Sequence, residues 1–175
     1  PYLKKGQNTV SVQVFRFSDG SYLEGQDMWK LSGIERTVYL TARPPFAVYD
    51  FFVKASLDKQ YKDGLFSLKI AFNKKPSARE AQQSVQVKII DEEANNKILF
   101  EATPAITAKG EISINEVFPG IKKWNAETPH LYTLIINHIN KEGEIIETIS
   151  HKIGFRKAEI LHGLFLLNGV AIKFK

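Results

Sequence analysis

The chain has 175 residues, about the size of one domain or slightly more, and its 24 Lys and Arg against 19 Asp and Glu give a net charge of +5. The basic residues form no dense run, so we expect no nucleic-acid partner, because such partners require a clustered basic patch. The absence of cysteine excludes a disulfide framework, a thiolate metal site and a cysteine nucleophile. No apolar run reaches about 18 residues, so we expect no transmembrane helix and no membrane partner.

The first 43 residues contain two predicted strands. Apolar and polar residues alternate from Thr9 to Phe17, which is the pattern of a half-buried strand, and a shorter strand is predicted over residues 36–40. Pro44-Pro45 follows, and because proline cannot donate to a ladder we place a domain boundary there. The chain begins at Pro1 without an initiator Met or a signal-like apolar region, so we expect a piece of a longer protein.

A long segment between these two strands is rich in acidic and aromatic residues. Ser18 to Leu40 (SDGSYLEGQDMWKLSGIERTVYL) starts with a turn at Asp19-Gly20 and shows neither helical nor strand periodicity through most of its length. Long loops of this composition often hold binding residues. The alternative is a loop that packs on its own aromatic side chains.

Beyond Pro45, alternating apolar segments recur at nearly regular intervals. Strands are predicted at residues 51–57, 66–72, 85–89, 98–100, 112–114, 132–138 and 145–153. We predict no helix, and residues 77–83 (SAREAQQ) are expected to be loop. The fold class is therefore all-β: an immunoglobulin-like β-sandwich of about seven strands with flanking β segments from neighbouring domains. Without cysteine, its core must depend on aliphatic and aromatic packing.

The last residues predict a β-hairpin. Asn168-Gly169 lies between two apolar runs, and both residues tolerate the positive φ of a type I′ turn, so this is a strong hairpin signal. His162-Gly163 is a second predicted turn. The sequence ends within the following apolar run.

Three separated segments resemble glycoside hydrolase family 2. Ser18 to Leu40 resembles the end of the sugar-binding jelly roll of its large β-galactosidases, with QDMW at residues 26–29 as the specific element. WNAETPHLY at residues 124–132 resembles the W-x-x-E-x-P-x-L-Y element of the family's immunoglobulin-like domain. GFR at residues 154–156, followed by FLLNG at 165–169, resembles the junction into the catalytic barrel. The last two motifs are shared with β-glucuronidases and β-mannosidases.

The resemblance implies three parts and a function for the parent protein. The parts are the last jelly-roll strands at residues 1–43, a complete sandwich at 44–156, and the opening hairpin of a TIM barrel at 157–175. The family hydrolyses β-galactosides with retention, using two carboxylates that lie beyond Lys175. No acidic pair here substitutes for them, since Asp91-Glu92-Glu93 and Glu142 with Glu144 are expected in solvated turns. We therefore expect the chain alone to be inactive.

The resemblance also assigns roles within residues 18–40. Asp27 matches a jelly-roll aspartate that binds sugar hydroxyls and a sodium ion, a role that suits a carboxylate because hard cations prefer oxygen ligands. Asp19 matches an aspartate at a structural magnesium, although an Asx-turn is the expected role in this chain. Trp29 and Arg36 are expected to support the loop. For Asp27 the alternative is local backbone capping.

The resemblance assigns structural roles to Trp124, Tyr132 and Arg156, with sugar stacking as an alternative for the two aromatic residues. The four histidines lack the spacing of metal ligands. The implied partner is a β-galactoside, and the parent enzyme is expected to be a homo-oligomer. Two other interpretations stay open: a stand-alone carbohydrate-binding or adhesion module, and another glycosidase of the same family. Nothing indicates the compartment.

Overall fold

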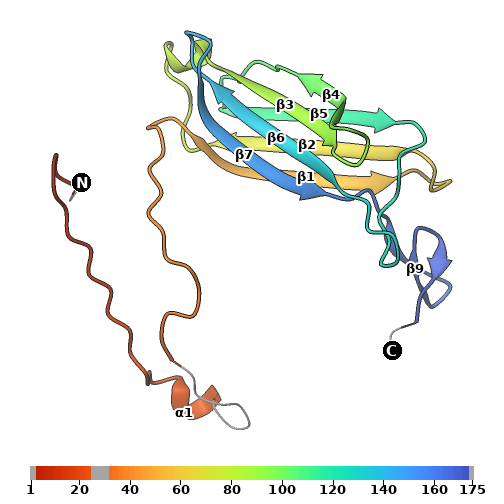
Figure 1. Ribbon diagram of the computed structural model, residues 1–175, viewed down its shortest axis with the longest axis horizontal. Coiled ribbons are helices and arrows are strands. Elements are labelled where there is room, and N and C mark those ends of the chain that lie inside the picture. The colour runs from red at the N-terminus through yellow and green to blue at the C-terminus, as the bar shows by residue number, and fades with distance from the viewer. Residues whose placement is uncertain (1–2, 25–31, 174–175) are drawn as a thin grey trace. The chain divides into compact units, whose positions relative to one another are not determined.

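The computed structural model describes residues 3–24 and 32–173, and the chain divides into two compact units, Pro1–Ala42 and Arg43–Lys175. In the first unit, α1 (Ser21–Glu24) is a short helix whose start is closed by a hydrogen bond from Ser21 N to Ser18 O (3.0 Å). Figure 1 shows the elements of both units. None of the described helices is long and apolar enough to span a membrane.

The two strands predicted in the first unit are not formed. Residues 9–17 and 36–40 have no strand assignment, and their side chains, Val10, Val12 and Val14 included, are exposed. A period-2 pattern yields a strand only where a neighbouring segment offers a ladder of backbone hydrogen bonds, and no described residue of this unit pairs with either segment. The alternation was therefore read correctly, but the strand prediction was wrong for these residues.

The second unit contains a β-sandwich. Its strands are β1 (Val48–Leu57), β2 (Gly64–Phe72), β3 (Ser84–Asp91), β4 (Lys97–Ala102), β5 (Glu111–Phe118), β6 (Tyr132–Ile139) and β7 (Ile145–Ile153). They form one sheet of order β1-β2-β5 and another of order β4-β3-β6-β7, with antiparallel neighbours throughout. Each of the seven predicted strands is found.

The connections between the sheets give the immunoglobulin-like order. After β2 the chain crosses to the other sheet for β3 and β4, returns for β5 beside β2, and crosses again for β6 beside β3. The register aligns apolar residues on the inner faces, as in Leu68 opposite Ile114 and Val87 opposite Ile136. All four are buried, so the two inner faces together form the core.

Aromatic clusters close the two ends of this core. At one end the rings of Phe46 and Phe72 stack with centroids 4.3 Å apart, and His138 meets both edge-on. At the other end Phe155, fully buried, makes edge-to-face contacts with Tyr132 at 5.5 Å and with a further core phenylalanine. The expectation of a core made of aliphatic and aromatic packing is confirmed.

The connection between β2 and β3 contains a short 3₁₀ helix, η1 (Glu80–Gln82), where we predicted loop. A reciprocal capping box explains the difference. Ser77 N donates to Glu80 Oε2 at 2.8 Å, and Glu80 N donates to Ser77 Oγ at 3.4 Å. Lys74 also pairs with Glu80, at 2.7 Å. The contact with Lys74, together with hydrogen bonding from Ser77 to the carboxylate, holds the pKa of Glu80 down to about 2.

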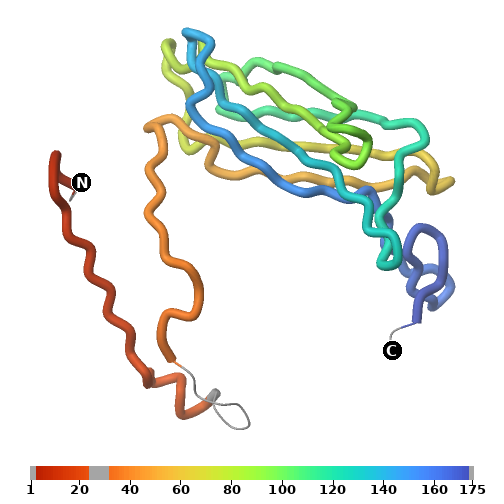
Figure 2. The backbone as a smooth tube through the Cα atoms, in the orientation of Figure 1, coloured from red at the N-terminus to blue at the C-terminus, as the bar shows by residue number. Residues whose placement is uncertain are grey.

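A small three-stranded sheet follows the sandwich, made of β8 (Ala158–Leu161), β9 (Leu164–Leu167) and β10 (Val170–Ala171). Both predicted turns are present, with φ of 50° and 75° at His162-Gly163 and 52° and 79° at Asn168-Gly169. These values are those of type I′ turns. In Figure 2 the blue chain leaves the sandwich at the end where the connection between β5 and β6 also lies, and it turns there into the last strands.

Candidate functional site

The structure brings only part of the predicted site together. Asp27 and Trp29 lie outside the described residues. Asp19 and Arg36 are both exposed in the first unit, Asp19 within a turn. Trp124, Tyr132 and Arg156 belong to the second unit, where Arg156 contacts Trp124, and both Trp124 and Tyr132 contact Phe155.

Trp124 is fixed by the turn that follows it. Asn125 Oδ1 accepts hydrogen bonds from the backbone N–H groups of Glu127 (3.0 Å) and Thr128 (2.7 Å), so the chain reverses and Trp124 pairs with Pro129. Trp124 N also donates to Phe155 O at 3.0 Å. The Asn in the WNAETPHLY motif is therefore the residue that closes the turn, by the mechanism of an Asx-turn.

Arg156 lies over the indole ring. Its guanidinium carbon is 4.6 Å from the ring centroid, which is a cation–π contact, and its backbone N donates to Ala55 O at 3.2 Å. The backbone also approaches Trp124 closely, since a Cβ at Gly154 would lie 2.9 Å from Trp124 Cβ. Each residue of the GFR motif thus has a packing role: Gly154 under Trp124, Phe155 in the core and Arg156 over the ring.

Tyr132 is buried, and its hydroxyl ties the start of β6 to the preceding loop. It accepts a hydrogen bond from Lys122 N at 3.1 Å and donates to Lys122 O at 3.3 Å. Burial raises the pKa of Tyr132 to about 12. A tyrosine at the start of this strand whose hydroxyl bonds upstream backbone, here 10 residues earlier, resembles the tyrosine corner of immunoglobulin-like domains. Tyr132 is therefore a packing residue and offers no surface to a ligand.

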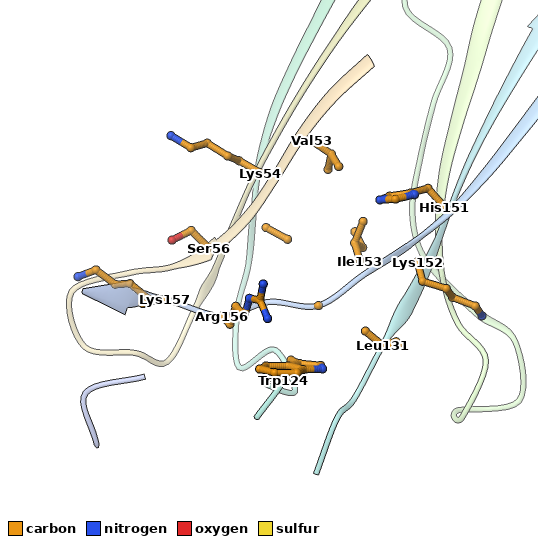
Figure 3. Close-up of a pocket in the computed structure, with 13 residues that line it drawn as sticks. Val53, Lys54, Ser56, Trp124, Leu131, His151, Lys152, Ile153, Arg156 and Lys157 are labelled. Atoms are coloured by element: carbon orange, nitrogen blue, oxygen red, sulfur yellow. The ribbon is translucent and has the colours of Figure 1, made fainter. Parts of the chain in front are cut away.

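A groove of about 560 Å³ lies beside the Trp124–Arg156 pair, between β1 and β7. Arg156 points into it above Trp124, whereas Lys54 and Lys157 point away on one side and Lys152 on the other (Figure 3). None of its thirteen lining residues is Asp or Glu. Because retaining glycosidases need two carboxylates about 5–5.5 Å apart, the residues of this groove cannot hydrolyse a glycoside by that mechanism.

The acidic turn after β3 is more structured than we predicted. Asp91 is buried, and its Oδ1 lies 3.3 Å from Nε2 of the buried His130, without the alignment of a hydrogen bond. His130 Nδ1 is 2.8 Å from Glu93 Oε2. Glu92 accepts hydrogen bonds from Thr133 and Lys152. The prediction of a solvated turn was therefore wrong for Asp91, because a histidine far along the chain covers it.

The other acidic pair lies in a solvated turn, as predicted. Glu142 and Glu144 are exposed in the turn after β6, where Asn140 Nδ2 donates to Glu144 Oε2 at 2.9 Å. Across residues 3–24 and 32–173, no group of three or more acidic or histidine side chains could hold a metal ion. Asp19 on its own would supply a single ligand.

Sequence reasoning missed the residues that fasten the last hairpin to the sandwich. Asn168 Nδ2 donates to Trp124 O at 3.0 Å, and Asn168 Oδ1 accepts from Lys157 N at 3.0 Å. Tyr61 donates to Glu159, which also pairs with Lys157 at 3.0 Å. The hydrogen bond from Tyr61 and the pairing with Lys157 lower the pKa of Glu159. The only sequence signal was the Asn-Gly turn, which indicated a backbone conformation but no side-chain partner.

Comparison with known proteins identifies the family. Residues 46–156, more than half of the chain, match the family described as glycosyl hydrolases family 2. Residues 1–44 match the sugar binding domain of that family. The chain belongs to glycosyl hydrolase family 2.

Its relatives in this family include β-galactosidases. The enzyme of Priestia megaterium is 38% identical over 173 residues, and that of Streptococcus thermophilus is 38% identical over 174 residues. The alignments cover 98% and 99% of this chain but only 17% and 16% of those enzymes. This family 2 chain therefore spans about a sixth of the length of the curated relatives it matches.

Solved structures of β-glucuronidases share its fold. The β-glucuronidase of Parabacteroides merdae superposes with a TM-score of 0.62 at 23% identity, covering 74% of this chain and 16% of that one. The β-glucuronidase of Bifidobacterium dentium complexed with coumarin-3-O-glucuronide gives 0.60 at 21% identity, covering 71% and 20%. At such identities the likeness shows the fold alone.

Proposed function

We propose that this chain is the non-catalytic linking part of a retaining β-galactosidase that hydrolyses terminal β-galactosides in carbohydrate metabolism. The observation that carries the proposal is the 38% identity to β-galactosidases across 98% of the chain, through both family 2 matches. In this proposal the sandwich is a spacer between the sugar-binding segment and the catalytic domain. The two catalytic carboxylates belong to the rest of the parent enzyme.

The structure supports a spacer rather than a binding module. Trp124, the aromatic residue considered for sugar stacking, has Arg156 over its ring, and Tyr132 is buried in the core. The groove beside them is lined by basic and apolar side chains. We therefore expect the chain alone to show no turnover of a nitrophenyl β-galactoside.

The parent enzyme itself tests the proposal. We expect it to hydrolyse nitrophenyl β-galactoside with a kcat/KM well above that for the β-glucuronide and β-mannoside analogues. The β-glucuronide assay matters because the solved structures that share the fold are β-glucuronidases. A parent protein that prefers the glucuronide or the mannoside would place it in another activity class of the same family.

Two ions belong to the proposal through the resemblance alone. Asp27 would bind sugar hydroxyls and a sodium ion, with the other ligands from the parent enzyme, and Asp19 would give one oxygen to a structural magnesium. Asp19 is exposed and so can reach ligands outside this chain. Asp27→Asn in the parent enzyme should lower activity strongly with little loss of stability. Near-normal turnover and an unchanged sodium response would remove Asp27 from the site. We also expect a homo-oligomer, which light scattering would measure.

A further inference from the structure

The hairpin after β7 is fastened to the sandwich by the side chain of Asn168. Its amide nitrogen donates to Trp124 O, and its amide oxygen accepts from Lys157 N, both at 3.0 Å. Asn168 N also donates to Lys157 O at 2.8 Å. One residue thus joins the hairpin turn, the segment leaving β7 and the loop that precedes β6. We call this set of three hydrogen bonds the Asn168 bracket.

The residue type fits this bracket closely. Asn168 has φ of 52°, a left-handed conformation that Asn, Asp and Gly adopt most readily. Among these three, Asn alone has a side chain that both donates and accepts hydrogen bonds at neutral pH. Trp124 is itself held by its backbone bond to Phe155 and by Arg156 over its ring. The bracket therefore joins the turn to a residue of the sandwich, Trp124, that other contacts already hold in place.

A second set of contacts braces the hairpin from the β1–β2 side. Tyr61 donates a hydrogen bond to Glu159, Glu159 pairs with Lys157 at 3.0 Å, and Lys157 Nζ lies 5.1 Å from the centroid of the Tyr61 ring. The ring also packs against the turn, since a Cβ at Gly169 would lie 2.5 Å from it. Contacts from two different loops, with Lys157 in both sets, thus hold this short segment in one orientation.

We propose that Asn168 is a positioning residue of the parent enzyme. The Asn168 bracket fixes the direction in which the polypeptide enters the catalytic domain, and thereby the placement of that domain against the sandwich. This inference rests on the proposed function. Because a misplacement of about 1 Å far from the chemistry can cost on the order of 100-fold in rate, the effect should be measurable.

The test uses three variants of the full-length parent enzyme. Asn168→Gly permits the same left-handed backbone conformation and removes both side-chain hydrogen bonds of the bracket. Asn168→Asp keeps the acceptor for Lys157 N and removes the donor to Trp124 O. His162→Gly is the matched control, because His162 occupies the other type I′ turn of the same three-stranded sheet, at φ of 50°, and is exposed. Among the described residues it has no hydrogen bond or ion pair.

Active sites are titrated with a covalent fluorinated galactoside inhibitor, so that kcat is expressed for each folded site. We expect Asn168→Gly to lower this kcat by about fivefold or more, Asn168→Asp to fall between it and the wild type, and His162→Gly to stay within about twofold. Hydrogen exchange of the backbone amide of Lys157 should accelerate in Asn168→Gly. Such acceleration reports loss of the bracket independently of catalysis.

The outcomes separate the two proposals. A wild-type parent enzyme without β-galactosidase activity would overturn the proposed function. An active parent in which kcat per titrated site is unchanged by Asn168→Gly would overturn the positioning role, even if Lys157 exchange accelerates, because the bracket would then be only a local brace. A purely structural effect lowers the titrated fraction and leaves kcat per site unchanged. If Asn168→Gly fails to fold, Asn168→Asp decides by the same criterion.

Discussion

Replacing Tyr132 by Phe tests whether the hydroxyl fixes the start of β6. The substitution removes one oxygen atom and keeps the ring that packs against Phe155 and His130. It leaves Lys122 N and Lys122 O without the partners they have at 3.1 and 3.3 Å. The change is therefore confined to two hydrogen bonds in a part-buried site.

The expected loss follows from those two bonds. An unsatisfied part-buried backbone group costs about 1–3 kcal/mol, and the Lys122 side chain is exposed, so water can partly replace the hydroxyl. We therefore expect Tyr132→Phe to lower the free energy of unfolding by about 1–2 kcal/mol at pH 7. For a chain of this size that corresponds to a fall in Tm of roughly 2–4 °C per kcal/mol.

The pKa of Tyr132 adds a second, independent expectation. It is raised by burial from 10.0 to about 12, so the neutral hydroxyl stabilises the folded state fully below pH 10. This stability is lost between pH 10 and 12, as the unfolded state releases its proton first. Two pKa units correspond to roughly 3 kcal/mol, which is comparable to the loss caused by the substitution. The stability difference between the two proteins should therefore shrink above pH 10 and approach zero or reverse.

Urea unfolding at pH 7, 9.5 and 11, followed by far-UV circular dichroism, measures both effects. Other titrating groups, including Tyr61 with its raised pKa, are common to both proteins and cancel in the difference. The control is Tyr49→Phe, since Tyr49 is 73% exposed and should change little. Equal stabilities of Tyr132→Phe and wild type at pH 7, with no change in their difference up to pH 11, would refute the reasoning.

Three further predictions concern the sandwich. Burial lowers the pKa of His138, so the contribution of its neutral ring to the free energy of unfolding is complete above about pH 6.5 and is lost as pH falls through the folded-state pKa. In urea unfolding, His138→Phe should therefore reduce the loss of stability on the acid side. His162→Gln, at an exposed position, should not. Gly64→Ala should lower the free energy of unfolding by about 1–3 kcal/mol in the same assay, because the added Cβ would lie 2.8 Å from Phe155. In the Phe155→Leu background, the loss caused by Gly64→Ala should be smaller. Glu80→Gln should lower Tm above pH 4.5, and the difference from wild type should vanish toward pH 2, where the wild-type carboxyl takes up its proton.

The strands of the sandwich were predictable because each carries its own signal. In β2 and β3, buried residues occupy every second position, and that period is set by the pleat of a single strand. The turn at Asn168-Gly169 was predictable for the same reason, since positive φ is a property of the residues themselves. The pattern at Thr9–Phe17 is equally clear, yet no strand forms there, because pairing requires a second segment.

The site was only partly predictable. The resemblance singled out Trp124, Tyr132 and Arg156, and the structure shows them in contact with the same loop and strand end. The side-chain contacts of Asn168 with Trp124 and of Glu159 with Tyr61 could not be predicted, because the partners are far apart in the sequence: Trp124 lies 44 positions from Asn168, and Tyr61 lies 98 positions from Glu159. Single contacts of this kind leave no periodic pattern in the sequence. The same holds for Asp91, which the sequence placed in a solvated turn and which His130 covers.

The sequence by itself determined the all-β class, the number and order of the sandwich strands, and the two left-handed turns of the final three-stranded sheet. These follow from interactions between residues close in sequence, whose preferences repeat or are local. Only the tertiary structure decided which strands share a sheet, which polar groups are buried, and how Asn168 fastens the hairpin to the sandwich. Those features depend on contacts between residues far apart in sequence, and each such contact exists only once the two sheets have packed.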